Sequence, residues 1–163
     1  MSYAGDVAPA AAYTVLADTP DAVLVDVRTR AEWSWVGAPD LTALGKSVVP
    51  IEWVGFPGGA RNGAFLAELA AAVPKEATVL FLCRSGVRSV AAAEAATAAG
   101  WTAAHNVLEG FEGNPDAAGH RGTTGGWKLF LGEWAELGED MMGLEVLACR
   151  GCGKVELRIP DEG

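Results

Sequence analysis

The chain has 163 residues, of which 50% are hydrophobic and 20% are charged, a composition typical of one globular domain with a core of its own. Its net charge of −9 argues against a protein that holds nucleic acid through the phosphates. No stretch approaches the length of apolar sequence that spans a bilayer, and the N-terminus lacks the pattern of a secretory signal. The three cysteines are an odd count, so we expect no disulfide scaffold and a reducing, cytoplasmic setting.

Segments with strand-like and helix-like patterns alternate along the chain. The predicted helices are Val7–Asp18, Thr29–Val36, Ala64–Val73 with Phe65, Leu66 and Leu69 at helical spacing, and a segment that begins near Val87 and ends at Gly100. The predicted strands are Ala22–Val27, Ser47–Trp53 with Pro50 at an edge or bend, Thr78–Leu82 and Thr102–Val107. Such alternation predicts an α/β fold in which a parallel sheet carries helices on both faces.

Cys83 directly follows the apolar run of residues 78–82, at the end of a strand where ligands bind in sheets of this kind. Gly86 then permits a turn, so that successive backbone N–H groups and the start of a helix can face one anion. Arg84 and Arg88 add positive charge, and we expect Cys83 to ionise more readily than an ordinary thiol. The alternative is a cysteine that only fills space at the end of a buried strand.

The loop CRSGVRS (83–89) resembles the active-site loop of single-domain rhodaneses. Three further segments are similar to motifs of that family, namely VLVDVRTRAEW (23–33), NVLEGFEG (106–113) and GWK (126–128). The resemblance covers about residues 13–130 and implies a rhodanese-like, three-layer fold around a five-stranded parallel sheet. It also implies transfer of a sulfane sulfur from a donor such as thiosulfate to a thiol, cyanide or protein acceptor.

In this chemistry the Cys83 thiolate attacks the outer sulfur of the donor and becomes a persulfide. Backbone amides from Arg84 to Ser89, Gly86 and Val87 included, would donate to the terminal sulfur of that persulfide. Arg84 and Arg88 would attract the anionic donor, and Ser85 and Ser89 can add hydroxyl donors. The scheme requires no metal, nucleotide or organic cofactor.

Two other functions stay open. One is a sulfur-relay or regulatory module that carries the persulfide for a protein partner. The other is a phosphatase or arsenate reductase of the same fold, but such phosphatases place five residues between cysteine and arginine. Here four residues separate Cys83 from Arg88, and this smaller ring suits one sulfur atom better than a phosphoryl group.

Asp26, Arg28 and Glu32 form a second group of charged residues. Arg28 and Glu32 are four apart and are expected to pair across one helical turn. Asp26 ends a strand and can accept backbone N–H bonds. The resemblance suggests that all three support the architecture around the site rather than the chemistry.

We expect residues 1–134 to form the rhodanese domain and residues 135–163 to form a C-terminal tail outside the family pattern. Cys149 and Cys152 in that tail are consistent with half of a zinc site, with a thiol that exchanges sulfur with Cys83, or with a disordered end without a role. His120 and Arg121 lie in a glycine-rich stretch, which we interpret as a solvated loop rather than a cover for the site.

Overall fold

The computed structural model describes residues 2–131, 145–148 and 155–158. A five-stranded parallel sheet with the strand order β1-β5-β4-β2-β3 forms its centre. Its strands are β1 (Gly5–Val7), β2 (Val23–Asp26), β3 (Val49–Pro50), β4 (Val79–Leu82) and β5 (Ala104–Val107). The expected α/β fold with a five-stranded parallel sheet is thus confirmed, and the segment 78–82 is its middle strand.

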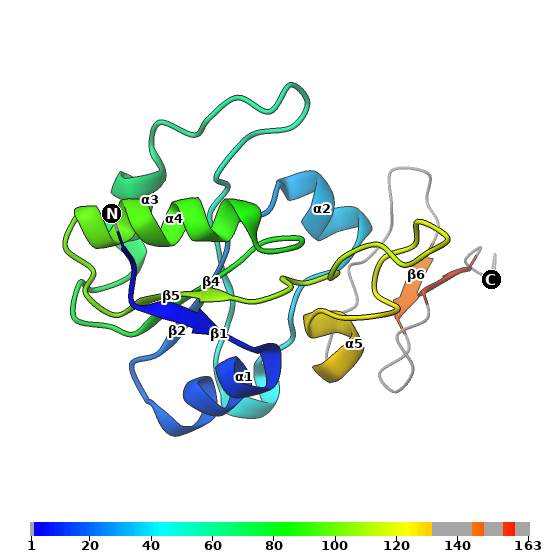
Figure 1. Cartoon of the computed structure of the whole chain (residues 1–163), viewed down its shortest axis with the longest axis horizontal. Coiled ribbons are helices and arrows are strands. Elements are labelled where there is room, and N and C mark those ends of the chain that lie inside the picture. The colour runs from blue at the N-terminus through cyan, green and yellow to red at the C-terminus, as the bar shows by residue number, and fades with distance from the viewer. Residues whose placement is uncertain (1, 132–144, 149–154, 159–163) are drawn as a thin grey trace, which may run out of the picture.

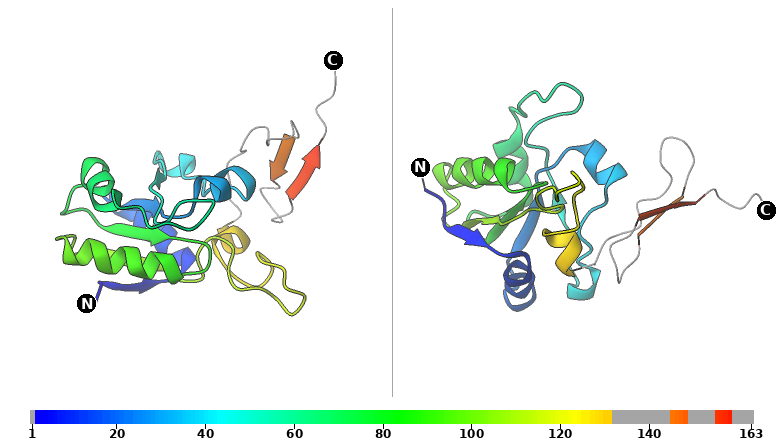
Figure 2. Two further views of the ribbon diagram at one scale, coloured as in Figure 1. Left: turned by 90° about the horizontal axis from the view of Figure 1, so that it is seen from above. Right: turned by 45° about the vertical axis from the view of Figure 1, so that its right-hand side comes forward.

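Helices cover both faces of this sheet. They are α1 (Pro9–Asp18), α2 (Arg30–Trp35), a 3₁₀ turn (Thr42–Leu44), α3 (Phe65–Ala72), α4 (Val87–Ala98) and α5 (Trp127–Leu131). In Figure 1, α3 and α4 lie above the strands, and α1 and α5 lie below them. The right-hand view of Figure 2 keeps α3 and α4 on the side of the sheet opposite to α1.

The middle strand is buried on both faces, which explains its uninterrupted apolar sequence. Val79 and Phe81 belong to the core cluster beneath α3 and α4. Leu80 and Leu82 belong to a second cluster that includes residues of α1 and α5. Successive side chains of a strand point to opposite faces, so β4 packs into both cores. This packing on both faces fixes the position of the carboxyl end of β4.

Two details differ from the sequence prediction, and a third agrees with it. Val7 belongs to strand β1 rather than to the first helix, which begins at Pro9 with proline in its first turn. Leu66 is 39% exposed, whereas Phe65 and Leu69 of the same helix are buried. Pro50 does lie on an edge strand, as expected for a residue without an N–H group.

A separate antiparallel pair of strands, β6 (Glu145–Ala148) and β7 (Val155–Arg158), lies in the tail, where the sequence predicted no element. Cys149, Cys152 and the expected boundary at residues 134–135 fall outside the described residues, so the interpretations of the tail remain predictions. Within the described part of the chain, no helix has the length and apolar character needed to cross a bilayer.

Candidate active site

Cys83 lies at the carboxyl end of β4 and is only 1% exposed. The chain then turns through Gly86, whose φ of 107° is a left-handed value that favours glycine, and α4 begins at the next residue. This turn aims the Gly86 N–H at the sulfur, with the nitrogen 3.0 Å from the Cys83 Sγ. The sulfur is therefore held at a helix N-terminus by a backbone donor, an arrangement that suits negative charge.

Ser89, in the first turn of α4, links the cysteine to a buried polar chain. Its Oγ lies 3.1 Å from the Cys83 Sγ and donates to the Asn106 Oδ1 at 2.6 Å. The Asn106 Nδ2 in turn donates to the Asp6 Oδ1 at 2.9 Å, and this fixes the direction of the amide. Since the one hydroxyl proton of Ser89 goes to Asn106, Ser89 accepts from the neutral Cys83 thiol.

Arg88 forms an ion pair with Glu32 of α2, with each of two guanidinium nitrogens 2.7 Å from a carboxylate oxygen. Burial by itself would raise the pKa of Glu32. Hydrogen bonds from Arg88 and the Thr29 N–H, together with the charges of Arg88 and Arg28, lower that pKa to about 2. The expected pair between Arg28 and Glu32 is wrong: Glu32 instead joins α2 to the active-site helix.

Arg28 pairs with Asp26, and both side chains are fully buried. The Arg28 Nη2 lies 2.7 Å from the Asp26 Oδ2 and also donates to the Gly37 carbonyl at 2.6 Å. The guanidinium carbon lies 4.3 Å from the centre of the Phe111 ring. The Asp26 Oδ1 accepts the Arg28 N–H, which is the backbone bond that was expected of it. These contacts tie the end of β2 to the segments around the site.

Gly110 forms the floor under the active-site loop. A Cβ atom at this position would lie 2.4 Å from the Cys83 carbonyl oxygen, well inside any real contact. Beside it, the Phe111 N–H donates to the Cys83 carbonyl at 2.7 Å and the Glu112 N–H donates to the Arg84 carbonyl at 3.0 Å. The glycine of the 106–113 motif was the signal for this role, but sequence reasoning did not name Gly110 as a site residue.

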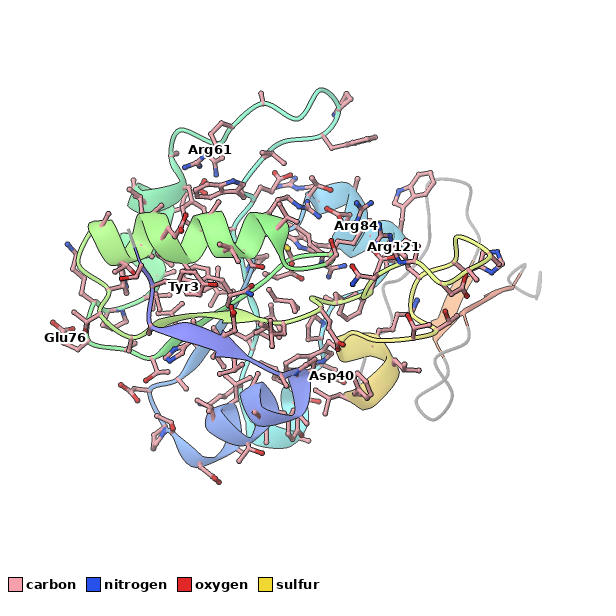
Figure 3. All side chains as sticks on the ribbon, viewed as in Figure 1. Tyr3, Asp40, Arg61, Glu76, Arg84 and Arg121 are labelled. Carbon is pink, nitrogen blue, oxygen red and sulfur yellow. The ribbon has the colours of Figure 1, made fainter. Side chains whose placement is uncertain are left out.

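The remaining loop residues face outward. Arg84 and Val87 are exposed and Ser85 is half-buried, with no hydrogen bond recorded from the Ser85 hydroxyl to the sulfur among the described residues. Figure 3 shows Arg84 beside α2. Arg121 donates to the Gly113 carbonyl at 2.6 Å, so its guanidinium is held within the 113–126 loop. His120 is exposed in that same loop.

In the part of the chain that the structure describes, no three histidine, cysteine or acidic side chains come together in a way that would hold a metal ion.

Comparisons with known proteins agree with this architecture. A family profile described as "STR4 middle domain" matches residues 4–128. The crystal structure of Rv0390 from M. tuberculosis is 56% identical with a TM-score of 0.73, and the match covers 78% of this chain and 94% of that one. The uncharacterized protein RC0915 of Rickettsia conorii is 37% identical over 120 residues, or 72% of this chain and 92% of that protein.

A plant protein extends the comparison. The protein THYLAKOID RHODANESE-LIKE, chloroplastic, of Oryza sativa subsp. indica is 36% identical over 111 residues, which are 67% of this chain and 22% of that protein. The five-stranded parallel sheet, the cysteine loop after its middle strand and these matches lead to one conclusion. The chain belongs to the rhodanese-like family, and its residues 4–128 match the family profile described as the STR4 middle domain.

Proposed function

We propose that this chain is a sulfurtransferase that moves a sulfane sulfur through a persulfide on Cys83. The observation that carries the proposal is the setting of the Cys83 sulfur. It lies at the N-terminus of α4, with the Gly86 N–H donating to it and the Gly86 nitrogen 3.0 Å away. A negatively charged sulfur is stabilised there by the helix dipole and by a backbone donor.

The first half of the reaction loads the cysteine. The Cys83 thiolate attacks the outer sulfur of thiosulfate, the new bond joins the two sulfur atoms, and sulfite leaves with the electron pair of the broken bond. The persulfide carries one negative charge, as the thiolate did. The donation of the Gly86 N–H to Sγ supports the proposal that loop amides stabilise this charge.

The second half unloads the cysteine. An acceptor such as cyanide, a thiol or a protein thiol attacks the outer sulfur, and the electron pair of the Cys83 sulfur–sulfur bond returns to Sγ. Arg84 is the loop cation that attracts an anionic donor, because Arg88 is already neutralised by Glu32. No step requires a metal or an organic cofactor.

Steady-state production of thiocyanate from thiosulfate and cyanide tests the proposal. We expect turnover in the full chain and its loss in Cys83→Ser. The double variant Cys149→Ser/Cys152→Ser is measured beside it, and unchanged turnover would remove these two thiols from the mechanism. Intact mass of the protein after thiosulfate treatment should show a gain of about 32 Da, one sulfur atom, that is confined to proteins with Cys83.

Other outcomes would assign other functions. A stable persulfide with negligible turnover would favour the relay or regulatory module. Hydrolysis of an aryl phosphate that depends on Cys83 would favour a phosphatase, against the ring of four residues between Cys83 and Arg88. Absence of any gain in mass on Cys83 would overturn the proposal.

A further inference from the structure

A cavity of about 840 Å³ lies beside the active-site loop, between α2 and the segment that follows β3. Trp35 and Arg30 line it from α2, Val54 and Phe56 from the 54–59 segment, and Arg84 and Arg88 from the active-site loop. Thiosulfate has five heavy atoms and needs only about 150 Å³ at the volume of one water molecule per atom. The cavity is several times larger than the proposed donor requires and has the size of sites that hold organic ligands.

The walls of the cavity include two large aromatic side chains. Trp35 is 61% exposed and Phe56 is 71% exposed, so both present apolar surface that a ligand could cover. Phe56 lies in an ordered turn, since the Gly55 N–H donates to the Ala60 carbonyl at 2.8 Å and the Gly59 N–H donates to the Gly55 carbonyl at 3.1 Å. Clustered aromatics of this kind mark binding surfaces more often than they occur at random on a surface.

The charged side chains that line the cavity indicate the charge of its ligand. Arg30 and Arg84 are exposed, and no ion pair is recorded for either guanidinium within the described part of the chain. Arg88, by contrast, is paired with Glu32. Two unpaired cations on one cavity of a protein with a net charge of −9 favour an anionic ligand over a neutral or cationic one.

We propose that this cavity receives the sulfur acceptor, and that the acceptor is an organic thiol with an apolar body of aryl size and a carboxylate or similar anionic group. This inference rests on the function proposed above. The aryl body would contact Trp35 and Phe56, and the anionic group would lie near Arg30 and Arg84. In this proposal the acceptor, not the sulfur donor, fills the cavity and contacts its aromatic walls.

The transfer step balances without an oxidant. The acceptor thiol loses its proton to solvent, its thiolate attacks the outer sulfur of the Cys83 persulfide, and an acceptor persulfide forms. The bond between the outer sulfur and Sγ breaks, and its electron pair stays on Sγ. The Cys83 thiol itself is almost fully buried, so the acceptor has to reach the outer sulfur, which extends about 2 Å from Sγ.

The test follows the discharge of purified Cys83 persulfide by intact mass, with three alkyl thiols whose rates are compared at equal thiolate concentration. 4-(Mercaptomethyl)benzoate has both the aryl body and the carboxylate. Benzyl mercaptan has only the aryl body, and 3-mercaptopropionate has only the carboxylate. We expect the first to discharge the persulfide about tenfold faster than either of the others at equal low thiolate concentration.

Variants of the lining residues test recognition of the aryl body and of the carboxylate separately. For each variant, the rate of discharge by a thiol is divided by its rate of discharge by cyanide. Phe56→Ala or Trp35→Ala should slow both aryl thiols about fivefold to tenfold and leave 3-mercaptopropionate unchanged. Arg30→Gln should slow the two carboxylates and leave benzyl mercaptan unchanged. Phe130→Ala is the matched control, since Phe130 is 57% exposed but does not line this cavity.

The proposal is overturned if the three thiols react alike, or if the variants at positions 30, 35 and 56 change all of them equally. Equal reactivity of the small thiols would instead point to a protein as the occupant. Because cyanide discharge is measured in the same series, a persulfide that forms and reacts with cyanide leaves the sulfurtransferase function standing. Failure to form the persulfide would overturn both the sulfurtransferase function and the acceptor site.

Discussion

Both carboxylate oxygens of Glu32, in α2, accept hydrogen bonds from Arg88, in the first turn of α4, at 2.7 Å each. The two residues are 56 positions apart in the sequence. Glu32 also caps its own helix by accepting the Thr29 N–H at 2.9 Å. One carboxylate therefore fixes the start of α2, the start of α4 and, through α4, the loop that surrounds Cys83.

The Glu32→Gln variant should reveal this ion pair as a pH-dependent loss of stability. The fold lowers the pKa of Glu32 from 4.5 to about 2, so its contribution is complete above about pH 4.5 and is lost as pH falls toward about 2. We expect the variant to unfold with a free energy lower by on the order of 1–3 kcal/mol at pH 7. Urea unfolding at pH 7, 4 and 3 measures the difference.

The difference between wild type and Glu32→Gln should shrink at pH 3, because the carboxyl of the unfolded chain is then protonated and only the folded state keeps it ionised. Glu76→Gln is the control, because Glu76 is an exposed glutamate far from α2 in Figure 3. A difference that stays constant from pH 7 to pH 3 would contradict the role assigned to Glu32.

Arg88→Lys and Arg84→Lys should separate stability from binding of the donor. Lysine at position 88 keeps the charge but cannot form two parallel hydrogen bonds to Glu32, so we expect the Tm to fall by about 2–6 °C. Arg84 is exposed and forms no ion pair with another residue of the described part of the chain, so its variant should keep the Tm within about 1 °C. The measurements are thermal unfolding and steady-state kinetics.

In the kinetics, Arg84→Lys should raise the KM for thiosulfate severalfold, because lysine keeps the charge but cannot donate the two parallel hydrogen bonds that a guanidinium offers to an oxyanion. If Arg84→Lys lowered the Tm as much as Arg88→Lys, the two arginines would share one structural role and this division would be wrong.

The fold and the position of the loop could be predicted because both depend on local pattern. The apolar runs of β2 and β4, the helices between them and the turn at Gly86 each leave a signature in a short window of sequence. Strand β1 leaves none, since it has three residues and begins with Gly5 at a φ of 141°. Its place at the edge is set by pairing with β5.

The pairing of the charged residues could not be predicted in the same way. The rule for residues four apart requires both to lie in the helix, but Arg28 precedes Thr29, the N-cap of α2. Arg28 is therefore free to turn back to Asp26, and Glu32 is free to meet Arg88. Which charges meet depends on how α2 packs beside α4, and no short window of the sequence contains that information.

Ser89→Ala should lower stability. It leaves the buried Asn106 Oδ1 without its donor, which costs about 1–3 kcal/mol. Urea unfolding at pH 7 measures the loss. Thr97→Val is the control on the same helix, since the Thr97 hydroxyl only donates to the Ala93 carbonyl one turn before it.

A double-mutant cycle of Ser89→Ala and Asn106→Ala tests whether these two hydrogen-bonded side chains act as a unit. Residues in one hydrogen-bond network are coupled, so the two losses of stability should differ from a simple sum by at least about 0.5 kcal/mol. Additive effects would mean that Asn106 does not act through Ser89.

Gly110→Ala should disrupt the active site more than its backbone angle alone would explain. Gly110 has a φ of 63° and Gly45 has a φ of 67°, so alanine is strained at both positions, at a cost of about 1–2 kcal/mol. A Cβ at Gly45 meets no atom within 4 Å, whereas one at Gly110 meets the backbone of Cys83, Arg84 and Ser85 at 2.4–2.6 Å. The overlap should add about 1–3 kcal/mol.

Gly45→Ala is therefore the matched control for the overlap at Gly110. Because the clash falls on the loop that carries the nucleophile, Gly110→Ala should also slow thiocyanate production, even at temperatures where circular dichroism shows the variant folded. Gly45→Ala should keep the wild-type rate under the same conditions. Equal losses of stability and equal rates in the two variants would show that the loop can move away from position 110, and that Gly110 does not hold it in place.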